Sequence, residues 1–225
     1  MCINILYMLA FASAFEEGAA ITGDLVEKEP RPECIFQNAN LFDHRGHPVS
    51  CAALAGKSVA LYFAGEWCPL CRTFTPALQH FYAQYKDVIE IIFISSDDSE
   101  AEAKKHYLHQ IAGEGTDLEA RIRKLQGSRA LENHSSKPPA RAQTAWLSLG
   151  YGDPLADELK RKHRVWSGRE TSKFGFRRRS GVPCVVVIKP DGEEASFIQG
   201  ERFGAAALRE WEPDSRSAWP LKEEM

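Results

Sequence analysis

Two cysteines three positions apart, Cys68 and Cys71, have the type and spacing for thiol chemistry in this 225-residue chain. On the first turn of a helix, residues at this spacing share one side, so their sulfurs can form a small-loop disulfide. The unpaired N–H groups and the dipole of a helix N-terminus favour a thiolate at Cys68. Such surroundings lower the pKa of a nucleophilic cysteine below its usual value of about 8.5. The pair therefore predicts thiol–disulfide redox chemistry, and the alternative is half of a metal site.

Four further cysteines and two histidine pairs bear on this choice. A zinc site at the pair would need two more ligands, and the candidates are Cys34, Cys51, Cys184, His44 with His47, and His106 with His109. None of them forms a second close cysteine pair, so we expect a redox site without a bound metal. We interpret Cys2, Cys34 and Cys51 as structural or incidental. Cys184 is interpreted as a buried apolar residue, and its alternative role is a third redox thiol.

The segments on either side of the pair predict a strand followed by a helix. Residues 57–64 form a short apolar run next to two glycines, which is typical of a strand buried on both faces. Within residues 72–86 the apolar side chains recur at helical spacing on one face. Pro69 suits the first helical turn, where no N–H is needed, whereas Pro76 inside the helix should kink it. The strand thus delivers Cys68 to the N-terminus of a helix.

Much of the remaining chain continues this alternation. A second buried strand at 88–95 precedes a helix that begins at a capping box of Ser99 and Glu102 and reaches about Ala112. Asp153 is expected to cap a further helix that starts at Pro154. Short strands are expected at 34–36 and 40–42, a return to the core at 146–149, strands at 184–188 and 194–198, and a terminal helix at 205–210. Alternating strands and helices predict parallel pairing within an α/β sheet.

The chain divides into three parts. Residues 1–33 are interpreted as a leader that is either disordered or weakly signal-like. Residues 3–14 are mostly apolar and end in an A-x-A sequence, but no Lys or Arg precedes them. Residues 34–212 form one domain with an insertion at 113–143, where the hydrophobic periodicity is weak. Residues 213–225 form a C-terminal tail.

The composition excludes several classes of protein. The chain is 44% hydrophobic and 26% charged, the balance of a globular domain. It has no run of 18 or more apolar residues, so a membrane span is not expected. The net charge of −3 is not that of a general nucleic-acid binder. Residues 160–179, however, hold nine bases and one acid. This segment is either a solvated basic face, or a docking patch for an acidic partner or a nuclear-import signal.

The segment from Tyr62 to Leu78, YFAGEWCPLCRTFTPAL, resembles the active-site segment of thioredoxin-fold proteins. It is most similar to the tryparedoxin and nucleoredoxin branch, which typically carries Trp-Cys-Pro-Pro-Cys-Arg followed by Phe-Thr-Pro. The stretches 54–57, 94–97 and 181–183 are similar to the same branch. This resemblance covers about residues 38–112 and 144–200. It implies a thioredoxin-like fold, in which helices flank a central mixed sheet.

The resemblance also implies roles for individual residues. Cys68 would be the nucleophile that attacks a disulfide of a partner protein, and Cys71 would resolve the mixed disulfide. Pro183 would be a cis proline that faces the cysteine pair, and the backbone of Val182 would pair with a substrate strand. Supporting positions around the substrate would be Trp67, Pro69, Leu70 and Arg72.

Three departures from the branch's pattern are informative. Leu70 replaces the usual second proline, which leaves the reduction potential open. Glu66 stands before the tryptophan where a small residue is commoner, and its carboxylate can oppose a thiolate at Cys68. Tyr62 lies six residues before Cys68, where thioredoxins proper carry a buried aspartate. The sequence therefore does not identify the proton acceptor of Cys71.

The resulting expectation is a protein-disulfide reductase. It would take electrons from an upstream thiol or flavoprotein reductant and pass them to disulfide-containing proteins such as peroxidases. No cofactor is needed beyond its own Cys68–Cys71 disulfide. The expected location is the cytoplasm, with the nucleus as a second one, and residues 3–14 leave the secretory pathway open. One alternative is a redox-switched interaction module without turnover. The other is a secreted or membrane-side reductase of the cytochrome-maturation type.

Overall fold

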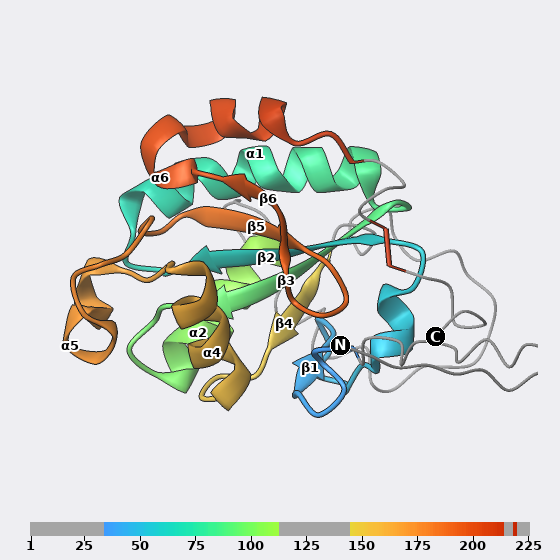
Figure 1. Cartoon of the computed structure of the whole chain (residues 1–225), viewed down its shortest axis with the longest axis horizontal. Helices are drawn as coiled ribbons and strands as arrows, with labels where there is room; N and C mark the ends of the chain where they lie inside the picture. The colour runs from blue at the N-terminus through green and yellow to red at the C-terminus, as the bar shows by residue number, and fades with distance from the viewer. Residues whose placement is uncertain (1–33, 113–144, 214–217, 220–225) are drawn as a thin grey trace, which may run out of the picture. The chain divides into compact units, whose positions relative to one another are not determined.

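A computed structural model describes residues 34–112, 145–213 and 218–219 of the chain. Its centre is a six-stranded mixed sheet with the strand order β1-β4-β3-β2-β5-β6 (Figure 1). The expected leader at 1–33 and insertion at 113–143, and Cys2, lie outside the described residues, as does most of the tail. None of the helices within the described ranges is long and apolar enough to cross a membrane.

The central strand β2 (Ser58–Ala64) positions the cysteine pair. All of its residues are buried, as the apolar run at 57–64 predicts. It pairs in parallel with β3 (Ile89–Ser95) from Ser58↔Ile89 to Ala64↔Ser95. The crossover between these strands is α1 (Pro69–Tyr85), which contains Pro76. This confirms the predicted strand–helix–strand unit, and the kink at Pro76 stays a prediction.

The outer strands complete a mixed sheet. On the β3 side, β4 (Leu147–Leu149) is parallel to β3, and β1 (Leu41–Phe42) is antiparallel to β4. On the β2 side, β5 (Cys184–Ile188) is antiparallel to β2, and β6 (Glu194–Ile198) is antiparallel to β5. Residues far apart in the sequence therefore meet at one end of the central strands, where β2 and β3 end and β5 begins.

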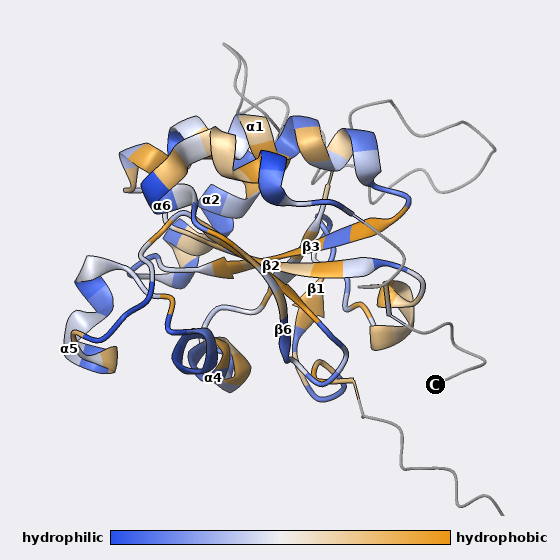
Figure 2. Ribbon diagram, turned by 45° about the horizontal axis from the view of Figure 1, so that its top comes forward, coloured by the Kyte–Doolittle hydropathy of each residue, from blue (hydrophilic) through white to orange (hydrophobic). Residues whose placement is uncertain are grey.

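Helices cover both faces of this sheet. On one face α1 contacts α2 (Glu100–Ala112) and the 3-10 helix η5 (Gly204–Glu210), while α4 (Pro154–His163) lies on the opposite face (Figures 1 and 2). The short helices α5 (Thr171–Phe174) and α6 (Gly200–Phe203) precede and follow the β5–β6 hairpin. The remaining 3-10 turns are η1 (Cys51–Leu54) and η4 (Gly168–Glu170). Figure 2 shows apolar residues along the central strands, the core that these helices bury.

Three expected elements differ in detail. Residues 34–36 form a turn rather than a strand, in which the Gln37 N–H donates to the Cys34 carbonyl at 2.9 Å. The turn is held by a Cys34–Cys51 disulfide and by Phe36, whose ring stacks on Trp219. The expected terminal helix at 205–210 is 3-10 rather than α. The Glu102 carboxylate accepts from the Asp98 N–H instead of closing the capping box on Ser99, although Ser99 Oγ accepts from the Glu102 N–H as predicted.

The cap of α4 matches its sequence signal. Asp153 Oδ1 accepts from the Leu155 N–H at 2.9 Å, and the helix begins at Pro154. Asp153 also accepts from Asn40 through its other oxygen, at 2.8 Å from the backbone nitrogen. The Asp153 side chain therefore caps α4 and also connects this helix to Asn40, the residue before β1.

Candidate dithiol active site

Cys68 and Cys71 lie at the point where β2 meets α1. Cys68 is the N-cap residue, with extended backbone dihedrals, and Pro69 is the first helical residue. The Cys71 N–H donates to Cys68 Sγ at 3.2 Å, which satisfies one orphan donor of the helix start. Both thiols are free, and both residues are buried. The local geometry inferred from the sequence is confirmed.

The two thiols differ sharply in acidity. The pKa of Cys68 is lowered to about 7, chiefly because the Cys71 thiol hydrogen-bonds to its sulfur and further by backbone N–H groups at the helix start, while burial opposes the shift. The pKa of Cys71 is raised far above its ordinary value because this thiol is buried and bonded to Cys68. Near neutral pH Cys68 is thus the more acidic of the two thiols, partly present as a thiolate, and Cys71 keeps its proton.

The loop before β5 closes the site from the other side. The Val182–Pro183 peptide bond is cis, as expected. The Cys68 thiol lies 3.5 Å from the Val182 carbonyl oxygen, to which it can donate. Within the described ranges, Val182 makes no hydrogen bond to another backbone group. The backbone of Val182 can therefore pair with an extended segment directly beside Cys68.

The loop at 65–67 is anchored to the end of β3. The Glu66 N–H donates to Asp97 Oδ1 at 2.7 Å, and the Trp67 indole N–H donates to the Ser96 carbonyl at 3.1 Å. Gly65 leaves room for this indole, because an added Cβ would lie 2.7 Å from its nitrogen. The Arg72 guanidinium donates to the Glu66 carbonyl at 3.2–3.3 Å.

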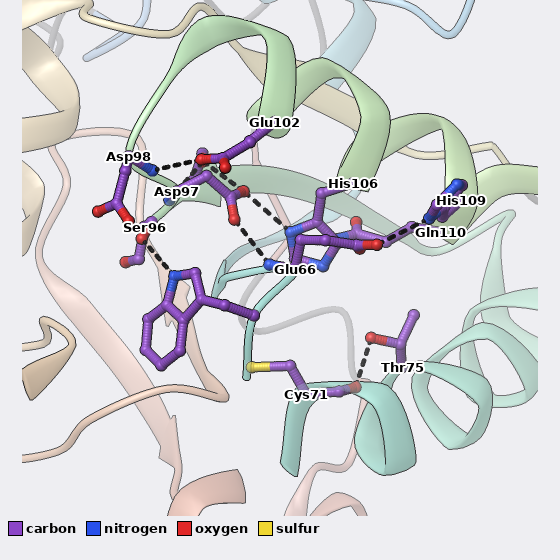
Figure 3. A network of polar contacts seen from close by, with 12 residues as sticks. Glu66, Cys71, Thr75, Ser96, Asp97, Asp98, Glu102, His106, His109 and Gln110 are labelled. Carbon is purple, nitrogen blue, oxygen red and sulfur yellow. Dashed lines mark hydrogen bonds and ion pairs between the residues drawn. The ribbon is translucent and has the colours of Figure 1, made fainter. Parts of the chain in front are cut away.

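Two histidines of α2 support the same loop through carboxylates (Figure 3). His106 Nδ1 lies 3.1 Å from Asp97 Oδ2, and both side chains are almost fully buried. His109 Nδ1 lies 3.0 Å from Glu66 Oε1. Burial alone would raise the pKa of Asp97, but the hydrogen bond and charge of His106, with bonds from Glu66 and Ser95, hold it below the ordinary value. From the sequence these histidines are candidates only for metal ligands, and their contacts with the two carboxylates are not predicted.

At position 62 the side chain is a tyrosine hydroxyl, so this position supplies no carboxylate to the cysteines. Its buried hydroxyl is 2.8 Å from Thr75 Oγ1, and Thr75 in turn donates to the Cys71 carbonyl at 2.8 Å. The pKa of Cys71 is raised chiefly by burial and by the hydrogen bond to Cys68, and the charge of the Asp97 carboxylate adds a smaller effect.

The other cysteines that the structure describes, Cys34, Cys51 and Cys184, are not thiols of this site. Cys184 follows Pro183, but it is buried and burial raises the pKa of its thiol strongly. This agrees with its interpretation as a small apolar residue. Cys34 and Cys51 bond to each other, which settles the structural interpretation of this pair. Among the residues placed by the structure, no three His, Cys, Asp or Glu side chains form a group that could hold a metal.

The basic segment 160–179 is largely paired with nearby acids. Six of its nine bases lie in ion pairs, namely Lys160 with Glu170, Lys162 with Glu193, Arg169 with Asp98, Lys173 with Asp157, Arg178 with Glu201 and Arg179 with Glu194. Lys160 is buried and also donates to the Ser95 carbonyl at 2.6 Å. Much of the positive charge that suggested an acidic partner is thus balanced by ion pairs within the domain.

A cis proline opposite a Cys-x-x-Cys pair, on a mixed sheet with this crossover, is the arrangement of a thioredoxin-like fold. Residues 56–117 match a family model described as thioredoxin-like. The chain is 36% identical to human nucleoredoxin over 167 residues, which are 73% of this chain and 28% of that protein. It is 41% identical to tryparedoxin from Trypanosoma brucei brucei over 70 residues, 30% of this chain and 48% of the relative. The resemblance drawn from the sequence is confirmed.

Solved structures are similar to this chain over most of its length. Thioredoxin from Wuchereria bancrofti is 28% identical with a TM-score of 0.46, and covers 79% of this chain and 90% of its own. Tryparedoxin I from Leishmania major is 21% identical with a TM-score of 0.47, over 77% and 86%. The matched part of the chain spans less than half the length of the curated relatives named above. The family model and these relatives support a thiol–disulfide redox function.

Proposed function

We propose that this protein is a protein-disulfide reductase in which Cys68 is the nucleophile and Cys71 the resolving thiol. The observation that carries the proposal is the difference in acidity between two free thiols on one helical turn. Cys68 has a pKa near 7, whereas burial keeps Cys71 protonated. A dithiol reductase needs this difference in acidity, because one sulfur must attack the partner disulfide as a thiolate while the other stays protonated until the second step.

The proposed reaction has two exchange steps. The Cys68 thiolate attacks one sulfur of a partner disulfide, so a Cys68–partner disulfide forms and the other partner sulfur leaves as a thiolate that takes up a proton. Cys71 then loses its proton and attacks the Cys68 sulfur, which releases the second partner thiolate. The dithiol has given two electrons to the partner and ends as a Cys68–Cys71 disulfide.

The electrons must be replaced after each turnover. We propose an upstream thiol or a flavoprotein reductant as the donor, and disulfide-containing proteins such as peroxidases as acceptors. No cofactor beyond the cysteine pair takes part in these steps. The proposed compartments are the cytoplasm and nucleus, although the Cys34–Cys51 disulfide is the kind of bond that persists in oxidising compartments.

A trapping experiment tests the proposal. Cys71→Ser should accumulate dithiothreitol-sensitive adducts with partner proteins through Cys68, because the resolving step is removed. Cys68→Ser is the matched control and should form none. In parallel, the wild-type protein should reduce insulin with dithiothreitol as the donor, faster than either variant. Absence of both adducts and turnover would exclude the reductase and favour the redox-switched interaction module.

A further inference from the structure

Exposed apolar side chains lie on the three elements that surround Cys68. Five large apolar side chains are exposed in the described part of the chain, and three of them are Leu70, Phe176 and Phe203, at 50%, 93% and 48% exposure. Leu70 is in the first turn of α1, Phe176 is in the loop that leads to the cis proline, and Phe203 ends α6. Exposed apolar groups concentrated around one site mark an interaction surface.

These three elements converge on one point. An added Cβ on Gly200, at the start of α6, would lie 2.9 Å from both the Phe74 ring of α1 and the Pro183 carbonyl oxygen. Glu201 accepts from the Gly181 N–H and pairs with Arg178, which joins α6 to the loop before Pro183. The end of this loop at residues 181–183 and the start of α6 therefore lie beside the first turns of α1, where Cys68 is the N-cap.

An arginine accompanies each exposed apolar side chain. Arg72 follows Leu70 by two residues, Arg177 follows Phe176, and Arg202 precedes Phe203. Unlike most bases of segment 160–179, none of these three forms an ion pair with a carboxylate among the described residues. Arg72 donates only to a backbone carbonyl, and Arg202 lies over the Phe203 ring at 5.0 Å.

Two acids near Cys68 have partners on other elements. Glu66 Oε1 lies 3.0 Å from His109 Nδ1, a contact that balances its charge only when the imidazole is protonated, whereas Glu201 forms an ion pair with Arg178 at 3.0 Å. The N-terminus of α1 adds a partial positive charge beside Cys68. Because three arginines without a carboxylate partner outnumber Glu66, the charge that remains to be complemented around the site is positive.

We propose that the Cys68 rim selects protein disulfides in extended segments that carry acidic and apolar residues. The rim consists of Leu70, Arg72, Phe176, Arg177, Arg202 and Phe203. A partner segment that pairs with the backbone of Val182, which bonds to no other described backbone group, would place its cysteine over Cys68 and its flanking side chains over the rim. Carboxylates on the partner would meet unpaired arginines, which speeds the encounter and disfavours basic partners. This inference rests on the proposed reductase function and specifies its substrate class.

Two synthetic peptides test the inference. Each is a ten-residue strand-forming peptide whose central cysteine is disulfide-bonded to 2-mercaptoethanol, with leucines and either glutamates or lysines at the flanking positions. Reduced protein is mixed with each peptide and with hydroxyethyl disulfide, and the second-order rate of thiol release is measured at low and high salt. The glutamate peptide should react about tenfold faster than the lysine peptide at low salt, and the ratio should fall towards one at 1 M salt.

Variants assign this preference to the rim. Arg72→Glu, Arg177→Glu and Arg202→Glu should each lower the glutamate-to-lysine rate ratio, and the triple variant should invert it. Arg209→Glu is the matched control. Arg209 stands two residues before Trp211, which stacks on Phe81 in the fourth turn of α1, whereas Cys68 is at the start of that helix. Phe176→Ser should slow both peptides about equally. Val88→Ser should slow neither, because Val88 is an exposed apolar residue just before β3, at the end of the central strands away from Cys68.

The outcomes separate this inference from the proposed function. Equal rates for the two peptides, or a preference for lysine, would overturn the rim's role while leaving the reductase intact. Failure to reduce any of the three disulfides, hydroxyethyl disulfide included, would overturn the reductase as well. A glutamate preference that survives the triple arginine variant would also overturn the assignment to the rim.

Discussion

The backbone N–H of Glu66 donates to Asp97 Oδ1 at 2.7 Å, so the residue two before the nucleophile is fixed by the end of the neighbouring strand. The other Asp97 oxygen faces His106 of α2 at 3.1 Å. A single buried carboxylate therefore links β3, α2 and the active-site loop. Because the Asp97 side chain is buried, we expect these contacts to depend little on salt.

Replacing Asp97 with asparagine tests this link. The amide keeps an acceptor for Glu66 but removes the charge that faces His106, so the variant should lose about 2 kcal/mol of unfolding free energy at pH 7, measured in urea. The pKa of Asp97 is lowered in the folded state. Its contribution is therefore present above the unfolded pKa of about 3.9 and is lost as the pH falls through the folded pKa.

The control for that variant is Asp157→Asn, which breaks an exposed pair with Lys173. It should change stability by less than about 0.5 kcal/mol. The difference between the two variants should shrink at acidic pH, where Asp97 is protonated in both states. An Asp97→Asn variant as stable as the wild type at pH 7 would show that the buried carboxylate does not hold the loop.

The pH dependence of Cys68 provides a second prediction. Its rate of alkylation by iodoacetamide should rise with pH through a midpoint near 7, the pKa given by the Cys71 hydrogen bond. Cys71→Ala removes this main cause and should move the midpoint towards the ordinary value, so alkylation at pH 7 slows by about tenfold or more. Cys184→Ala should leave the midpoint unchanged. A midpoint unaffected by Cys71→Ala would show that the helix N-terminus alone lowers the pKa of Cys68.

Gly65 is a position where one methyl group should disturb the site. A Cβ there would lie 2.7–2.9 Å from atoms of the Trp67 indole, so the ring must leave the Ser96 carbonyl to which it donates. Gly65→Ala should cost about 1–3 kcal/mol and shift tryptophan fluorescence. Gly168→Ala is the matched control, because its Cβ would meet only Arg178, at an ordinary 3.9 Å. Equal effects of the two substitutions would contradict this packing.

The parts of the site that the sequence predicts are those built from local pattern. The apolar run of β2, the helical spacing of α1 and the proline at its first turn place Cys68 and Cys71 correctly without any knowledge of distant contacts. The contacts of His106 with Asp97 and of His109 with Glu66 join residues 9 and 43 positions apart. Histidines one turn apart fit a metal as well as a carboxylate, so sequence alone did not distinguish them.

The turn at 34–36 was mispredicted for a related reason. Its apolar residues suit a strand by propensity, but the pairing of Cys34 with Cys51 and the stacking of Phe36 on Trp219 are tertiary contacts that override propensity. The sequence spacing of Cys34 and Cys51 does not predict that their Cα atoms lie 6.4 Å apart.

That disulfide should stabilise the domain without affecting its chemistry. It closes a loop between residues 17 positions apart that ends before β2, whereas Cys68 follows β2, and such a loop corresponds to about 3 kcal/mol in the chain-entropy account. The double variant Cys34→Ser, Cys51→Ser should therefore unfold at lower urea concentration by roughly that amount. Its Cys68 alkylation midpoint should stay near 7, because the hydrogen bond from Cys71 is intact. A shifted midpoint would instead show that the two cysteine pairs are coupled through β2.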